Sequence, residues 1–112
     1  MKEVKPKRAA KFTAKYLDKL IEEATTDAYN ESEQVSGFFS LIEGDLDVPF
    51  TTRVLGQVVT VTGIEITEND QIVAICKLGN ITQSISVLDL PMPTPLPKGG
   101  EWIAAYHRWC GS

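Results

Sequence analysis

The sequence lacks the long apolar runs that mark membrane proteins and secretory signals. No stretch approaches the roughly 18–20 consecutive apolar residues that a membrane-spanning helix needs. The opening residues, MKEVKPKRAAKFTAKY, are basic but contain no apolar core of the kind found in a signal peptide. We therefore expect a cytoplasmic protein without a membrane partner.

Cysteine, histidine and catalytic motifs are also scarce. Cys76 and Cys110 are too few for a disulfide framework, and no Cys/His spacing fits a zinc site. His107 is the only histidine, and it lies in the C-terminal segment with no nucleophile motif beside it. G-x-S-x-G, P-loop and G-x-G-x-x-G motifs are all absent. These absences predict a protein that is not an enzyme, with a structural role for His107.

Positive charge is concentrated at the start of the chain, and negative charge in the rest. Residues 1–15 carry six Lys/Arg and one acid, whereas residues 16–112 carry five Lys/Arg and fourteen acids, a net charge of −9. The densest part is residues 18–47, with nine acids and the single base Lys19. A field of that sign repels nucleic acid and attracts cations, so we expect no nucleic-acid partner for the acidic part.

A single globular domain is predicted over residues 13–112, because 112 residues with 43% hydrophobic content suffice for one core. Residues 1–12 read as a flexible basic tail. This tail either keeps the protein in solution or touches an acidic partner or nucleic acid.

Two helices are predicted before residue 45. Apolar residues recur at helical spacing over 14–28, and Thr13 is an N-cap candidate. Asn30 followed by Glu33 resembles a capping box for a second helix, and Gly44 fits the residue just past its end. A glycine inside that helix, Gly37, indicates close packing against another backbone or a tolerated surface position.

The second half of the chain predicts strands and then a third helix. Four segments are rich in β-branched residues with near-alternating pattern and are separated by turn residues: FTTRV, QVVTVTGIEI, QIVAICKL and NITQSISVLDL. They predict a small antiparallel meander or barrel. Prolines at every second position over 91–97 predict an extended connector, or a ligand for SH3 or WW domains. Aromatic residues at helical spacing over 102–109 predict a helix lying across the sheet. The fold class is therefore α+β.

The segment EGDLDVPF, residues 43–50, places three carboxylates at alternate positions. Oxygen donors without Cys or His favour Ca²⁺ or Mg²⁺ over Zn²⁺. The EF-hand pattern is absent: Asp45-x-Asp47 begins like one, but its fifth position is Pro49 and its sixth is Phe50 instead of glycine. In an extended segment Asp45 and Asp47 would point to one side while Leu46 and Val48 point inward. The same alternation also fits a half-buried edge that binds no metal.

Several short motifs, in this order along residues 22–110, resemble the CcbP-like calcium-binding proteins, a family of small acidic bacterial proteins. They are Asp27-Ala28-Tyr29, Glu33-Gln34, Gly37 followed by aromatic residues, Glu43, Pro49-Phe50-Thr51, Arg53, Val61-x-Gly63 and His107-x-Trp109. The resemblance implies an SH3-like small barrel packed by flanking helices. It also implies Ca²⁺ binding by surface carboxylates without an EF-hand.

The functional hypothesis that follows is a calcium buffer or sensor. We expect the metal ligands to be Glu43, Asp45 and Asp47, joined by Asp27 and Glu31 from the turn between the helices. The alternative is an SH3-like protein-interaction module whose acidic face selects a basic protein partner and needs no metal.

Overall fold

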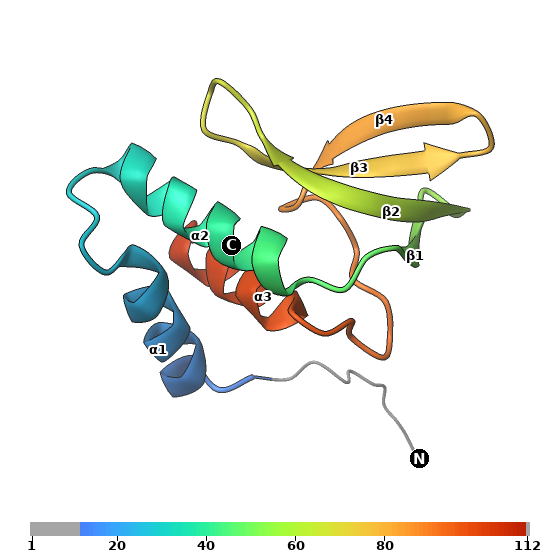
Figure 1. The fold of residues 1–112 in the computed structure, drawn as a ribbon. Coiled ribbons are helices and arrows are strands. Elements are labelled where there is room, and N and C mark those ends of the chain that lie inside the picture. The colour runs from blue at the N-terminus through green and yellow to red at the C-terminus, as the bar shows by residue number, and fades with distance from the viewer. Residues whose placement is uncertain (1–11, 112) are drawn as a thin grey trace, which may run out of the picture.

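The computed structural model describes residues 12–111, which form three helices beside a four-stranded antiparallel sheet (Figure 1). The helices are α1 (Ala14–Thr25), α2 (Glu31–Asp45) and α3 (Gly100–Trp109). The strands are β1 (Phe50–Val54), β2 (Gln57–Ile66), β3 (Ile72–Leu78) and β4 (Ile81–Ser86). The α+β class and the order of elements are as predicted. The predicted basic tail, apart from Phe12, lies outside the described residues.

Side-chain caps fix where the first two helices begin. Thr13 Oγ1 accepts a hydrogen bond from the backbone N–H of Tyr16 over 3.1 Å. Asn30 Oδ1 accepts one from the backbone N–H of Glu33 over 2.9 Å, and Glu33 Oε1 accepts one from the N–H of Tyr29 over 2.7 Å. These bonds satisfy N–H groups that the helix itself leaves unpaired. Both predicted caps are confirmed.

Gly37 lies where α2 meets α1. A Cβ atom at this position would overlap the backbone carbonyl of Ala24, so the two helices approach as closely as they do because residue 37 has no side chain. This confirms the close-packing interpretation. The first helix ends at Thr25, three residues earlier than predicted, and Asp27 in the following turn has a φ of 63°.

The end of α2 differs from the prediction. Gly44 does not terminate the helix, because the N–H of Leu46 still donates to the carbonyl oxygen of Ile42 over 2.9 Å. Asp45 is therefore the last helical residue, and Leu46 ends the helix in an extended conformation. Leu46 is buried as predicted, but Val48, also expected to face inward, is 39% exposed.

The sheet is an open meander in the order β1-β2-β3-β4, with a bulge between Val61 and Gly63. The described strands do not close into a barrel, so the meander is the predicted alternative that forms. Residues 87–99 form no helix or strand, as expected for the proline-rich connector. No helix within residues 12–111 is long and apolar enough to cross a membrane.

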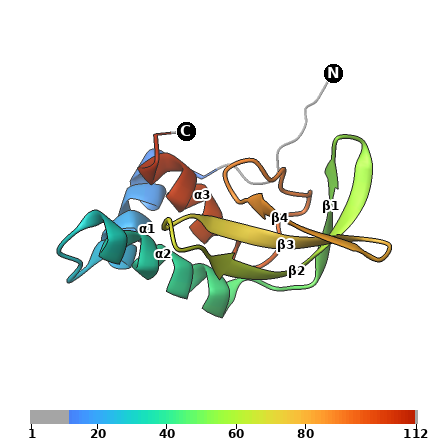
Figure 2. The same cartoon turned by 90° about the horizontal axis from the view of Figure 1, so that it is seen from above.

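The core joins the helices to one face of the sheet. Phe38 and Ile42 of α2 are fully buried, and the Phe38 ring lies 5.3 Å from the ring of Tyr106 and 5.2 Å from that of Trp109. The third helix therefore presents its aromatic face to α2 and also packs against α1. Its expected position across the sheet was wrong. Figure 2 shows the helices gathered at one end of the molecule, with the tips of the β1–β2 and β3–β4 hairpins projecting from the other.

Candidate metal site

Three of the predicted ligands lie around the C-terminal end of α2. Glu43 and Asp45 are in its last turn, Asp47 follows the helix, and all three are exposed. Successive helical residues are rotated by about 100°, so Glu43 and Asp45 leave the helix on nearly opposite sides. The predicted arrangement, with alternate acids on one side of an extended segment, is wrong for Asp45.

Asp45 has a partner on a distant element. Its Oδ2 accepts a hydrogen bond from the indole N–H of Trp102 over 2.8 Å. Trp102 is in the first turn of α3, where the helix dipole favours a nearby negative charge. The N-cap of that helix, Gly99, has no capping side chain, and a Cβ there would overlap the backbone of Asp45 and Leu46. The carboxylate of Asp45 thus stabilises the start of α3.

Asp47 is fixed through its backbone. Its N–H donates to the carbonyl oxygen of Lys98 over 2.8 Å and therefore does not continue the α2 ladder to Glu43. The last carbonyl groups of a helix have no partner within the helix and carry partial negative charge. A cation at this end would meet both those carbonyls and the exposed carboxylates.

The other two predicted ligands lie at the opposite end of α2. Asp27 is in the turn before the helix, and Glu31 is its first residue; both are exposed. Asp27 and Glu33 help to line an open hollow of about 410 Å³ between the ends of the two helices.

The predicted ligands omit one acid whose charge acts on the same tyrosine as that of Glu31. Asp70, in the turn between β2 and β3, acts together with Glu31 to raise the pKa of Tyr106, after burial, which is the larger cause. Both carboxylates therefore act electrostatically on Tyr106, although 39 positions separate them in the chain. Only the tertiary fold brings the β2–β3 turn near Tyr106, so no local sequence pattern predicts the influence of Asp70 on it.

The five predicted ligands cannot share one ion. Glu31 and Asp45 are fourteen positions apart along α2, a span of about 21 Å at 1.5 Å per residue, whereas Ca²⁺–oxygen distances are about 2.3–2.6 Å. Within residues 12–111, no three Asp, Glu, His or Cys side chains are gathered closely enough to hold a metal ion. The structure therefore gives two separate acidic groups, one at each end of α2.

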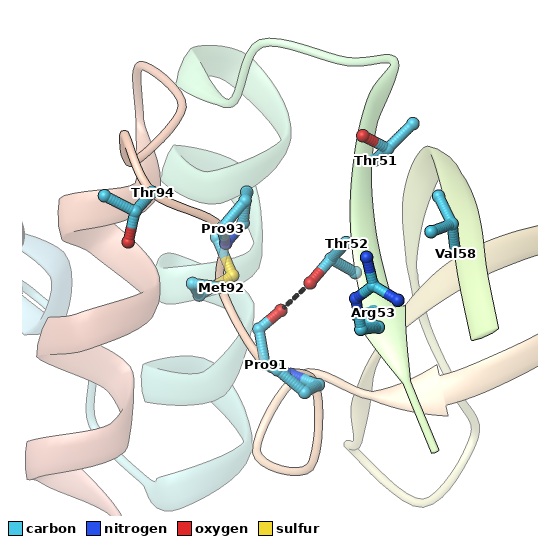
Figure 3. Close-up of a pocket in the computed structure, with 8 residues that line it drawn as sticks. All are labelled: Thr51, Thr52, Arg53, Val58, Pro91, Met92, Pro93 and Thr94. Carbon is cyan, nitrogen blue, oxygen red and sulfur yellow. Dashed lines mark hydrogen bonds between the residues drawn. The ribbon is translucent and has the colours of Figure 1, made fainter. Parts of the chain in front are cut away.

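His107 and a hollow beside β1 lie outside both acidic groups. His107 Nε2 lies 3.1 Å from the carbonyl oxygen of Val87, which agrees with a structural role. The hollow, of about 380 Å³, lies between β1 and the proline-rich segment and includes Arg53 in its lining (Figure 3). A guanidinium there disfavours a metal cation.

Comparison with solved structures identifies the fold. The crystal structure of CcbP from Anabaena matches with a TM-score of 0.72 at 17% sequence identity, over 92% of this chain and 95% of that chain. A structure described as a calcium-binding protein in the calcium-binding form matches with a TM-score of 0.69 at 17% identity, over 86% of this chain and 90% of that one. No family model and no curated protein matches the sequence.

Proposed function

We propose that this chain, which has the CcbP-like fold, binds Ca²⁺ through the exposed carboxylates at the ends of α2. The observation that carries the proposal is the placement of acids at both ends of one helix, on a fold that a solved neighbour, described as a calcium-binding protein, adopts in its calcium-binding form. The donors are oxygen only, which suits a hard cation. The sequence around them does not complete an EF-hand loop, because Pro49 and Phe50 follow Asp45-x-Asp47.

The C-terminal end of α2 is the better candidate of the two groups. Glu43 and Asp47 are exposed there, and Asp45 retains Oδ1 while Oδ2 accepts the bond from Trp102. The helix end adds backbone carbonyl oxygens, which Ca²⁺ accepts readily as ligands because its coordination is irregular. Asp27 and Glu31, at the N-terminal end, are proposed as a second and separate group.

The consequence of binding would be neutralisation of like charges. Acids that repel one another in the free protein would share a cation, and a ligand that binds only the folded state stabilises it by RT ln(1 + [L]/Kd). The protein would act as a buffer if that is the whole effect, and as a sensor if the α2–α3 junction also rearranges. The free thiols of Cys76 and Cys110 suit a reducing compartment such as the cytoplasm.

Calorimetric titration with Ca²⁺ and, separately, Mg²⁺ tests the proposal. Glu43→Gln/Asp47→Asn removes two charges at the C-terminal end, and Asp27→Asn/Glu31→Gln removes two at the N-terminal end. The matched control, Glu65→Gln/Asp89→Asn, removes two exposed charges outside α2. We expect the first variant to lose most of the Ca²⁺ affinity and the control to keep it. Absence of Ca²⁺ binding by the unmodified chain, or equal losses in all three variants, would refute the site.

A protein-interaction module with an acidic face remains the second candidate. It is favoured by one observation: no three acidic side chains within residues 12–111 converge as a preformed metal site would. Such a module would bind a basic peptide equally well with Ca²⁺ or with a chelator, and it would lose binding in Glu43→Lys/Asp47→Lys. Chelator-sensitive binding would instead assign the acidic face to the metal.

A further inference from the structure

The two edges of the sheet are protected very differently. At the β1 edge, Pro49 precedes the strand and Arg53 lies within it. The hydroxyl of Thr52 donates a hydrogen bond to the carbonyl oxygen of Pro91, and the segment that starts at Pro91 runs beside the strand (Figure 3). Proline, charge and a covering segment are the usual means of keeping an edge strand from pairing with another chain.

The β4 edge has none of these protections. Its sequence, ITQSIS, contains no charge and no proline, and the uncharged stretch extends over residues 79–88. Residues 81–84 are exposed. Within the described part of the chain, β4 is paired only with β3, and the one further backbone bond that reaches it is a turn bond from Asp89 N–H to the oxygen of Ser86. One side of β4 therefore offers its backbone to a new strand.

Apolar surface adjoins this open edge. Ile81 is 59% exposed and its cross-strand neighbour Leu78 is 41% exposed. Both help to line a hollow of about 190 Å³, whose lining has no charged residue. Its lining includes residues at the β1–β2 and β3–β4 turns, and these two turns project away from the helices (Figure 2). Exposed apolar surface next to an unpaired edge is typical of an association site.

We propose that two copies of this chain associate by antiparallel pairing of their β4 strands. A two-fold axis through Gln83 sets Ile81 opposite Ile85 of the partner subunit and Thr82 opposite Ser84 of the partner subunit. Apolar residues then face apolar residues and polar residues face polar ones, and each contact occurs twice, as a two-fold axis requires. The β3–β4 register places Ile81, Gln83 and Ile85 on one face, together with the hollow.

Charge favours a second copy as the occupant of the edge. The chain has a net charge of −4, and its acids are concentrated in residues 18–47. Two copies that met through α1 or α2 would bring like charges together, whereas residues 79–88 bring none. Pairing through β4 would join the two sheets into one continuous sheet of eight strands. This proposal is independent of calcium binding.

Sedimentation velocity over a range of concentrations tests the pairing. Gln83→Lys sets two ammonium groups opposite each other across the axis, and Gln71→Lys makes the same exchange at an exposed position in the β2–β3 turn. We expect the unmodified chain to shift from one-chain to two-chain mass as concentration rises. Gln83→Lys should weaken the dimer by at least about tenfold, because like charges in contact repel strongly, and Gln71→Lys should not.

A second variant and a second measurement guard against a folding defect in Gln83→Lys. Ile81→Gln removes only an exposed apolar contact and should also weaken the dimer, with unchanged circular dichroism. Backbone amides of β4 should gain protection from hydrogen exchange as the dimer forms. The proposal is overturned if the unmodified chain stays monomeric at every concentration, if both lysine variants behave alike, or if protection appears on a helix instead. Binding of a foreign extended peptide by a chain that stays monomeric would also overturn it.

Discussion

The indole N–H of Trp102 donates a hydrogen bond to Oδ2 of Asp45, joining the start of α3 to the last residue of α2 across 57 positions of the chain. The bond links a candidate metal ligand to the helix packed against it. Asp45 therefore has a structural role that does not depend on any metal. Its contribution to stability and its connection to calcium binding can be measured separately.

The Asp45–Trp102 bond should give a measurable coupling energy. A hydrogen bond to a charged group contributes about 1.5–3 kcal/mol. The contribution is smaller here because Asp45 is exposed, so water can hydrogen-bond its carboxylate when the indole is absent. We expect the double-mutant cycle of Trp102→Phe and Asp45→Ala to give about 1 kcal/mol by urea unfolding. Because the cycle subtracts the effect of each single substitution, the loss of packing when phenylalanine replaces Trp102 does not enter the coupling energy. A coupling near zero would mean that the bond contributes no stability in solution.

Calcium binding should be visible in the fluorescence of Trp102. If the ion engages Asp45, the negative charge beside the indole is neutralised, and the emission of Trp102 should change. We expect Ca²⁺ to alter the tryptophan emission of the unmodified chain and of Trp109→Phe, and to leave that of Trp102→Phe unchanged. An ion bound at the N-terminal group alone would give calorimetric heat without this optical change.

Two glycines of α2 should respond oppositely to alanine. A Cβ at Gly37 would overlap the backbone of α1, and overpacking of this kind costs about 1–3 kcal/mol. At Gly44 nothing lies within 4 Å of the added Cβ, so Gly44→Ala should stabilise the helix by about 0.5–1 kcal/mol. Urea unfolding of both variants measures the difference. Equal destabilisation by the two would show that close approach to α1 is not what selects Gly37.

Local chemistry made much of this fold predictable. The caps at Thr13 and Asn30 and the four strands depend on neighbouring residues or on periodicity, and they were predicted from the sequence. Close packing at Gly37 was one of two alternatives, and the structure shows that it is the one that holds. The end of α2 was not predicted correctly, because glycine after a helix matters only where the chain turns left-handed. Here Leu46 ends the helix in an extended conformation, held by its burial.

The arrangement of the candidate site depended on contacts that no local pattern encodes. One further helical residue turns Asp45 away from Glu43 and towards Trp102, and that contact spans two elements far apart in sequence. The predicted ligands fall into two groups, because Asp27 and Glu31 lie at the start of α2 and the other three lie at its end. The choice between meander and barrel was likewise left open by the sequence. In the structure the strands stay in an open order, and the Thr52 hydroxyl of β1 donates a hydrogen bond to the carbonyl oxygen of Pro91 instead of β1 pairing with β4.

The ion pair between Asp18 and Arg108 should appear in acid titration. Arg108 Nε lies 2.7 Å from Asp18 Oδ1, and this hydrogen bond from the guanidinium lowers the pKa of the Asp18 carboxyl. A lowered pKa adds stability that is present above the unfolded-state value and is lost as the pH falls through the folded-state value. By NMR titration, Arg108→Gln should return the Asp18 pKa towards its usual value, and Arg53→Gln should not. Both side chains are exposed, so salt should weaken the effect.

The phenol of Tyr106 should titrate later than an ordinary tyrosine. Burial raises its pKa to about 12, with smaller contributions from Cys110, Asp70 and Glu31. A raised pKa means that its contribution to stability is fully present below the unfolded-state value of 10.0 and is lost as the pH rises through the folded-state value. Thermal melts should therefore fall between about pH 10 and 12, and fall less in Tyr106→Phe. Ultraviolet titration should show a late phenolate step that this variant lacks. A titration of all three tyrosines in one step below pH 11, roughly one unit above the ordinary value, would contradict the burial of Tyr106 against Phe38.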